Sequence, residues 1–188
     1  NPTSNIITTV YTMPGKGEKG RFCLDCAWRC LDFQADQFGV AYPLPKSDLI
    51  AIPDFAAGAM ENWGCVTYRE AKVLTEKGQT SLATYKGIAR TCCHELAHQW
   101  FGNLVTMDWW SGLFLNEGFA RFMEFKSVNY LYPQWNIWNE FVQSVYSMAL
   151  SLDSMESSHP IHVEVNHPDE INSIFDAISY AKGASLLR

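Results

Sequence analysis

The sequence lacks the features that would place it among nucleic-acid-binding or membrane-spanning proteins. Its 14 Lys and Arg residues form no cluster that would match a row of phosphates, and the net charge is −6. No apolar run approaches membrane-spanning length, and residues 1–10 do not have the pattern of a signal peptide. We therefore expect no nucleic-acid partner and no transmembrane segment within these residues.

Glycosylation signals are also missing, although cysteines are not. No Asn-x-Ser/Thr triplet with a non-proline middle residue occurs, and six cysteines are present. Cys23, Cys26 and Cys30 have helical spacing, which favours free thiols packed on one apolar helix face over a metal site or disulfides. Free thiols without glycosylation sites favour a reducing, cytoplasmic setting.

The chain has neither an initiating Met nor a stop signal after the helical pattern at residues 179–188. We therefore expect a fragment that lacks flanking domains of the same polypeptide, including any upstream targeting signal. Its 188 residues, 47% of them apolar, are nevertheless enough for one domain with a sizeable core.

Strand patterns come early in the chain and helical patterns come later. We expect short strands or extended segments at residues 8–12, 48–53, 58–62 and 64–68. Apolar spacing predicts helices at residues 21–38, 80–100, 113–130 and 135–152, with further helical segments from residue 169 onward. This order predicts an α+β fold, in which a small mixed sheet is followed mostly by α-helices.

The strongest chemical signal is the HExxH pattern at residues 94–98. His94 and His98 are four residues apart in a predicted helix, so both imidazoles project from one face and can bind one Zn²⁺. Glu95 lies beside them, where a carboxylate can act as the general base on a metal-bound water. The pattern predicts a metallohydrolase with one zinc ion per chain.

Catalytic zinc sites usually have a third protein ligand, and Glu117 is the best candidate. It lies near the start of the next predicted helix among apolar neighbours, where a buried carboxylate needs a partner such as a metal. Glu124 follows two turns later on the same face. We expect Glu124 to orient a zinc-binding histidine through a hydrogen bond, with a solvated surface carboxylate as the alternative.

Three motifs, in order, resemble the gluzincin family of zinc aminopeptidases. They are residues 58–62 (GAMEN), residues 94–98 (HELAH), and Glu117, with eighteen residues between His98 and Glu117. Within that family, residues 132–138 and 171–188 are similar to the puromycin-sensitive branch. The resemblance implies that residues 21–188 are a thermolysin-like catalytic domain without its C-terminal helical domain. It further implies that residues 1–20 are a linker or the tail of a preceding β-rich domain.

The resemblance also implies a substrate site, formed by Gly58, Ala59, Met60, Glu61 and Asn62. An extended segment with Gly58 and Ala59 lets a peptide backbone lie close alongside it. Glu61 would make a charge-assisted contact with the α-ammonium group of the substrate. The implied partners are therefore peptides with a free N-terminus.

Tyr180 matches the family tyrosine that stabilises the tetrahedral intermediate, because a phenolic O–H donates well to an oxyanion. The implied function is hydrolysis of the N-terminal peptide bond by a zinc-activated water, with Glu95 as the general base. Three alternatives stay open: a thermolysin-like endopeptidase, an epoxide hydrolase with the same zinc ligands, and a catalytically incompetent zinc-binding fragment.

Two further groups of residues resemble metal ligands but favour ordinary roles. Cys92 and Cys93 directly precede His94, and we expect them to pack in the core because Cys93 points to a different side of the helix from the histidines. His159, His162 and His167 lie in a predicted loop, where we expect histidines without a metal.

Overall fold

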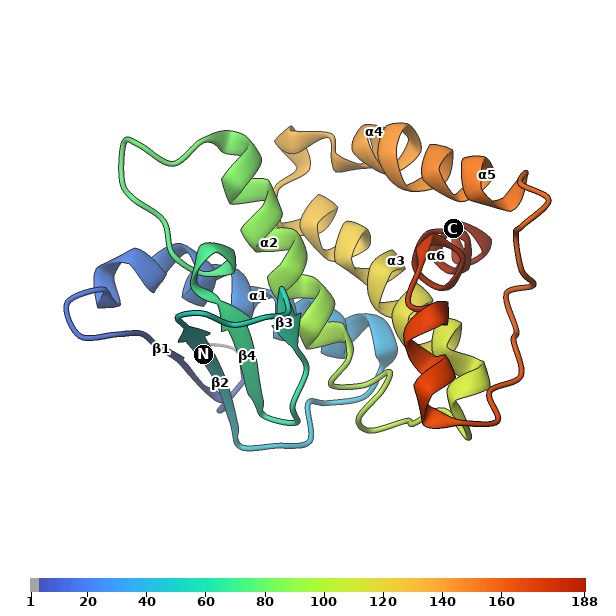
Figure 1. The fold of residues 1–188 in the computed structure, drawn as a ribbon. Coiled ribbons are helices and arrows are strands. Elements are labelled where there is room, and N and C mark those ends of the chain that lie inside the picture. Colours follow the sequence, from blue (N-terminus) through green and yellow to red (C-terminus); the bar gives the residue numbers. More distant parts are fainter. Residues whose placement is uncertain (1–3) are drawn as a thin grey trace.

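A computed structural model describes residues 4–188 and begins with a small sheet (Figure 1). The strand order is β1–β2–β4–β3, with bounds β1 (Ile7–Tyr11), β2 (Lys46–Ile52), β3 (Ala59–Met60) and β4 (Cys65–Arg69). Both β1 and β4 run parallel to β2, whereas β3 runs antiparallel to β4. The predicted mixed sheet is confirmed. The predicted strand at residues 8–12 is its edge strand, and residues 1–3 of the predicted leading segment lie outside the described residues.

One face of the sheet is buried, because side chains alternate along a strand. Leu49 and Ala51 of β2, and Val66 and Tyr68 of β4, all belong to the main hydrophobic core. The other positions of these two strands are partly or fully exposed, apart from Ser47, which is also buried. The sheet therefore contributes one apolar surface to a core that the helices complete.

Helix α1 (Arg21–Phe38) has the bounds that its apolar spacing predicts. It ends at Gly39, whose φ of 64° is the left-handed conformation that glycine adopts without strain at a helix C-terminus. Cys23, Cys26 and Cys30 have no exposed surface, so their predicted packing on one apolar face is confirmed.

Helices α2 (Leu82–Ala97) and α3 (Leu113–Leu131) form the centre of the molecule. The Ser81 hydroxyl accepts a hydrogen bond from the amide of Thr84 at 3.1 Å and so caps α2 at its start. Helix α2 packs against both α1 and α3. It ends at Ala97 rather than at the predicted Trp100, because residues 98–100 already form a turn.

The rest of the chain is helical but irregular. The predicted helix at residues 135–152 is a run of α4 (Ile137–Glu140), a π-helical segment (Phe141–Tyr146) and α5 (Ser147–Asp153). After a loop come a 3₁₀ segment (Pro168–Ile174), a second π-helical segment (Ile178–Lys182) and α6 (Gly183–Leu187). Short 3₁₀ turns occupy Gly17–Gly20, Glu70–Lys72, Trp110–Gly112 and Pro133–Trp135.

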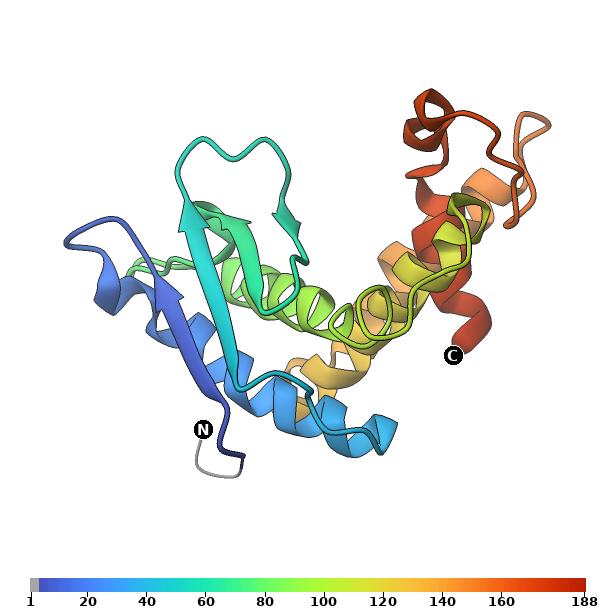
Figure 2. The ribbon, with the colours of Figure 1, turned by 90° about the horizontal axis from the view of Figure 1, so that it is seen from below.

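Two views place the sheet and the C-terminal segment on opposite sides of α2 (Figures 1 and 2). The sheet lies on one side together with α1, and α3 and α6 lie on the other. Within residues 4–188, no helix combines the length and the apolar character needed to cross a membrane. The arrangement leaves the C-terminal end of α2 between the sheet and α3, and the candidate site lies there.

Candidate active site

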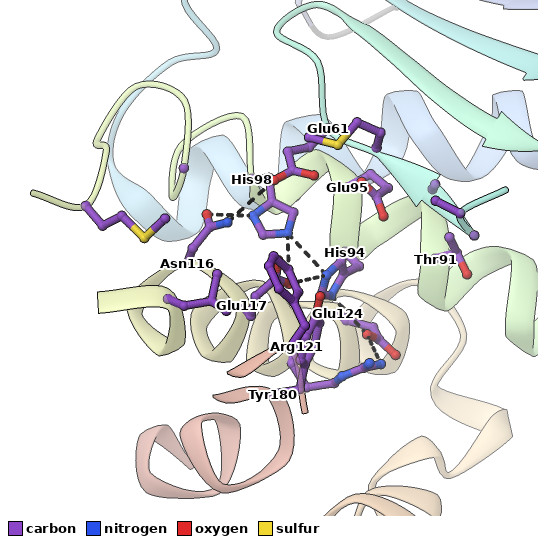
Figure 3. A pocket seen from close by; sticks show the side chains of 18 of the residues that line it. Glu61, Thr91, His94, Glu95, His98, Asn116, Glu117, Arg121, Glu124 and Tyr180 are labelled. Carbon is purple, nitrogen blue, oxygen red and sulfur yellow. Dashed lines mark hydrogen bonds and ion pairs between the residues drawn. The ribbon is translucent and has the colours of Figure 1, made fainter. Parts of the chain in front are cut away.

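The C-terminal end of α2 and the first turns of α3 bring three possible metal ligands together (Figure 3). His94 lies in the last turn of α2, and His98 is the C-cap residue with helical backbone angles (φ −61°, ψ −21°), so the two side chains project from the same side one turn apart. Helix α3 runs back along α2, which places Glu117 opposite both histidines. The exposed fractions of His94, His98 and Glu117 are 8%, 1% and 4%, so the group is almost completely shielded from solvent.

The three donor atoms form a triangle of the size that zinc requires. His94 Nε2 lies 3.2 Å from His98 Nε2 and 3.2 Å from Glu117 Oε2, and His98 Nε2 lies 3.5 Å from the same oxygen. Ligands about 2.0–2.1 Å from a tetrahedral Zn²⁺ are separated by about 3.3 Å. The three side chains therefore fit one zinc ion without rearrangement.

The outer nitrogen of His98 is hydrogen-bonded, and the outer nitrogen of His94 lies beside a carboxylate. His98 Nδ1 donates to the carbonyl oxygen of Phe101 and to Asn116 Oδ1, both at 3.0 Å. Glu124 Oε2 lies 3.3 Å from His94 Nδ1. A proton on each Nδ1 leaves a lone pair on each Nε2, and two lone pairs this close to a carboxylate need a cation between them.

Glu124 connects this site to two arginines. Arg90 Nε donates to Glu124 Oε1, and Arg121 Nη1 donates to Glu124 Oε2, each at 2.6 Å. Burial acts to raise the pKa of Glu124, but the two guanidinium groups outweigh it and hold the pKa at about 2. Glu124 is therefore ionised and contacts both cations and His94.

The protonation of the donors themselves follows from the same contacts. Burial acts to lower the pKa of His94, but Glu117 and Glu124 outweigh it and raise the pKa to about 10. Burial acts to raise the pKa of Glu117, but His94 and His98 outweigh it and hold the pKa well below its usual value. At neutral pH, the metal-free site therefore holds a proton that a metal ion must displace.

Glu95 differs from Glu117 and Glu124, each of which contacts a histidine or an arginine. Its Oε2 atom is buried and has no hydrogen-bond partner within residues 4–188. Burial raises the pKa of Glu95 to about 7, although His94 and His98 oppose the shift. A carboxylate that lines a cavity and has a pKa near neutrality has the properties of a general base.

The extended segment at residues 58–62 lies across the cavity from α3. Its strand β3 pairs with β4, where Ala59 faces Tyr68 and Met60 faces Thr67. The carbonyl of Gly58 accepts from the Arg69 amide at 2.9 Å, and Asn62 Nδ2 donates to Thr67 Oγ1 at 3.2 Å. Glu61 follows β3 directly, and its carboxylate lies beside His98 and Asn116 (Figure 3).

Tyr180 approaches from the C-terminal segment. Its ring stacks on the ring of His94, with centroids 6.1 Å apart and planes inclined by 14°. Burial raises the pKa of Tyr180 far above its usual range, so the phenol keeps its proton. A close helix crossing brings it here, because a Cβ added at Gly118 would lie 3.0 Å from the Cα of Gly183.

These groups line one cavity of about 910 Å³. Its floor carries the three donors and Glu95, and its walls include residues 57–61, Met107, Trp109, Phe175 and Tyr180. All residues of the GAMEN segment except Asn62 line this cavity. A cavity of this size can hold several side chains of a peptide.

Several residues of the site were not anticipated from the sequence. Arg121 lies three residues before Glu124, and this i, i+3 spacing on one helix could have predicted their ion pair. Asn116 directly precedes Glu117 but has no motif of its own. Arg90, Gln99 and Asn103 gave no signal, because their partners lie 34 to 42 positions away in the chain.

The other groups that resembled metal ligands have separate partners. Cys92 and Cys93 have no exposed surface, and Cys93 Sγ lies 3.9 Å from Cys26 Sγ in the core, as predicted. His159 Nε2 pairs with Asp176 Oδ2 at 2.7 Å, and His167 pairs with Asp169. Among residues 4–188, only His94, His98 and Glu117 have the geometry of a metal-binding group.

Comparisons with known proteins agree with this geometry. The profile described as "Peptidase family M1 domain" matches residues 22–188. Aminopeptidase M1-C of Oryza sativa subsp. japonica is 56% identical over 179 residues, which are 95% of this chain and 20% of that protein. The alanine/arginine aminopeptidase of Saccharomyces cerevisiae is 55% identical over 183 residues, 97% of this chain and 21% of that protein.

A third relative is the puromycin-sensitive aminopeptidase of Caenorhabditis elegans, which is 49% identical over 185 residues. This match covers 98% of the chain and 20% of the relative. The chain therefore spans about a fifth of the length of these curated relatives, and the family match over residues 22–188 includes every residue of the site described above.

Proposed function

The chain belongs to peptidase family M1, and we propose that it forms the zinc-binding catalytic core of an aminopeptidase. The proposed reaction is hydrolysis of the first peptide bond of peptides that have a free N-terminus. One observation carries the proposal: three metal donors and the Glu61 carboxylate line the same cavity. This combination provides for both hydrolysis and recognition of an α-ammonium group.

We propose that His94 Nε2, His98 Nε2 and Glu117 Oε2 hold one Zn²⁺ per chain. A zinc ion in such a site lowers the pKa of a water molecule and polarises a carbonyl group. Asn116 and the Phe101 carbonyl hold His98, and Glu124 holds His94, so both imidazoles keep the same nitrogen directed inward.

Glu95 is the proposed general base. Its carboxylate lines the cavity, where it takes a proton from the attacking water and delivers it to the leaving amine. Proton transfer in both directions favours a pKa near the working pH, and burial raises the pKa of Glu95 in that direction.

Tyr180 and Glu61 complete the proposed mechanism from opposite walls of the cavity. The neutral phenol of Tyr180 donates a hydrogen bond to the developing oxyanion. The Glu61 carboxylate binds the α-ammonium group, while residues 58–60 lie along the substrate backbone. Because the ammonium group precedes the first carbonyl by only two bonds, this contact restricts cleavage to the first peptide bond.

The surroundings of the domain are also a proposal. We propose that residues 21–188 are a catalytic domain, that residues 1–20 are a linker or the tail of a preceding β-rich domain, and that further domains of the polypeptide complete the substrate site. The coverage of about a fifth of each relative supports the last point. The six free cysteines support a reducing, cytoplasmic setting.

The test uses the full-length polypeptide that carries this chain, and peptides that differ only in N-terminal acetylation. We expect one zinc per chain and release of the first residue from free peptides only. A chelator should remove the activity, and added zinc should restore it. Equal cleavage of acetylated peptides would identify an endopeptidase, whereas bound zinc without any turnover would identify a zinc-binding chain that is not an enzyme.

A further inference from the structure

Three amide side chains around the site converge on a single residue, Glu61. Gln99 and Asn103 follow the second histidine of the metal site, and Asn116 precedes Glu117. Gln99 Nε2 and Asn103 Nδ2 both donate to the Glu61 carbonyl oxygen, at 3.2 and 2.8 Å. Asn116 Nδ2 lies 3.5 Å from Glu61 Oε1, within reach of the carboxylate. We call Gln99, Asn103 and Asn116 the amide clamp.

The other hydrogen bonds of the segment that the amide clamp holds are made by Asn62 and Gly64 rather than by Glu61. Strand β3 is only two residues long and ends at Met60, so Glu61 lies beyond the last strand pair. Asn62 and Trp63 are exposed, and Gly64 has a φ of 72°. Gln99 holds both ends of this stretch, because its Oε1 also accepts from the Gly64 amide at 2.9 Å. Its side chain is completely buried, which gives these hydrogen bonds a well-defined geometry.

The amide clamp is also joined to the metal site. The Oδ1 atom of Asn116 accepts from His98 Nδ1 at 3.0 Å, so one side chain contacts both a metal donor and Glu61. This approach requires Gly102, whose φ is 128°, because a Cβ there would lie 2.3 Å from Asn116 Oδ1. The backbone N–H of Asn103 closes this turn by donating to the His98 carbonyl oxygen at 3.0 Å. One rigid unit thus connects the metal donors to Glu61.

We propose that the amide clamp fixes the distance between the Glu61 carboxylate and the metal site, and so restricts cleavage to the first peptide bond. Its members are positioning residues, and the inference rests on the proposed aminopeptidase function. A residue of extended chain spans about 3.3–3.6 Å, so a displacement of Glu61 by a fraction of that length misaligns the substrate. Misplacement by about 1 Å can lower a rate by about a hundredfold.

The principal variant is Asn103→Ala in the full-length polypeptide, with Asn139→Ala on the exposed surface of α4 as the matched control. Substrates are an aminoacyl fluorophore with a free amino group and its N-acetyl counterpart. We expect Asn103→Ala to keep one zinc per chain, and to lower kcat/KM for the free substrate by about ten- to a hundredfold. The ratio of kcat/KM for the free substrate to kcat/KM for the acetylated substrate should also fall. Asn139→Ala should match the wild type in both measurements.

A second variant, Asn116→Asp, keeps the acceptor for His98 Nδ1 but loses the donor to Glu61. It should lower the same ratio at unchanged zinc content, and so it tests the inference if Asn103→Ala does not fold. In a Glu61→Gln background, Asn103→Ala should have little further effect on kcat/KM. Both changes act on the same contact, the one between the Glu61 carboxylate and the α-ammonium group of the substrate.

The two proposals fail in different ways. A wild type that does not prefer free amino groups would overturn the proposed function. A wild type with that preference, whose Asn103→Ala and Asn116→Asp variants keep the ratio unchanged, would overturn the role of the amide clamp. Additive effects of Asn103→Ala and Glu61→Gln would do the same, because the amide would then act independently of Glu61.

Discussion

The two faces of α2 are both buried, but one carries thiols and the other carries imidazole and carboxylate groups. On one face, Cys92 and Cys93 have no exposed surface and contact the thiols of α1. On the other face, His94, Glu95 and His98 have exposed fractions of 8%, 6% and 1%. Burial therefore does not distinguish the core from the site. What differs is the requirement that each face makes of its surroundings.

The core face requires matching volumes, since a buried thiol behaves as a small hydrophobic group. The site face requires charged and hydrogen-bonding partners, because an ionised group without them is strongly destabilised in the interior. Asn116, Glu117, Glu124 and the two arginines beside Glu124 supply these partners from α2 and α3. Substitutions on the site face should therefore change chemistry, and substitutions on the core face should change only stability.

The largest difference between the faces should come from Glu95→Gln. This variant removes the proposed base but keeps the shape, so we expect kcat to fall by about 10²–10⁴-fold with zinc content unchanged. The measurement is steady-state hydrolysis normalised to bound zinc. Cys93→Ala, two positions earlier in the same helix, is the control and should keep the wild-type kcat. Comparable loss in both variants would remove the distinction between the faces.

Glu124→Gln tests the partners of the site face. It removes the buried negative charge beside His94, Arg90 and Arg121. The side chains of the two arginines remain about a quarter exposed. We expect zinc affinity to fall about 10–100-fold and the free energy of unfolding to fall by up to about 3 kcal/mol. Metal competition titration and urea unfolding measure the two effects.

The control for Glu124→Gln is Glu140→Gln, which breaks the partly exposed ion pair with Lys86. This pair lies away from the zinc donors, and its loss should change the free energy of unfolding by less than about 1 kcal/mol. Equal effects of the two variants would mean that Glu124 behaves as an ordinary surface carboxylate.

The pH dependence of stability provides a sharper test of Glu95. In the chelated protein, its pKa of about 7 lies above the usual value of 4.5, so the folded state favours the protonated form. This contribution is fully present below pH 4.5 and is lost as the pH rises through about 7. Glu95→Gln should therefore gain stability over the wild type, on the order of 3 kcal/mol, across that interval. A difference between the two proteins that does not vary with pH would contradict the raised pKa.

The smallest effect is expected on the core face. Cys93→Ala removes a buried sulfur and should lower the free energy of unfolding by about 1 kcal/mol. The exposed Cys65→Ala should change it by less than about 0.5 kcal/mol. Thermal or urea unfolding measures both. A loss of zinc from Cys93→Ala would show that the thiol face takes part in the chemistry after all.

The regular part of the fold could be predicted because its signals are local. Helix α1 ends at a glycine that adopts a left-handed conformation, and α2 begins at a serine cap, so their spacing and boundaries are readable. The end of α2 was predicted three residues late, at Trp100 instead of Ala97. The turn that follows is held by bonds such as Gly102 N to Val105 O, which have no periodic pattern.

The same distinction applies to the site. His94 and His98 share a helix, so their spacing predicts a common metal, and the donor triangle fits one. The catalytic roles of Glu95, Glu61 and Tyr180 stay predictions. The amide clamp was missed because single hydrogen bonds between distant segments leave no spacing to read. Glu61 and its partners Gln99 and Asn116, for example, are 38 and 55 positions apart.

The crossing of α3 and α6 at Gly118 and Gly183 has a consequence for biosynthesis. Chains fold from the N-terminus as they emerge from the ribosome. His94, His98 and Glu117 all emerge before the crossing can form, whereas Tyr180, which stacks on His94, lies just before Gly183 of the crossing. We therefore expect the proposed metal site to assemble on a nascent chain before the Tyr180 phenol reaches it.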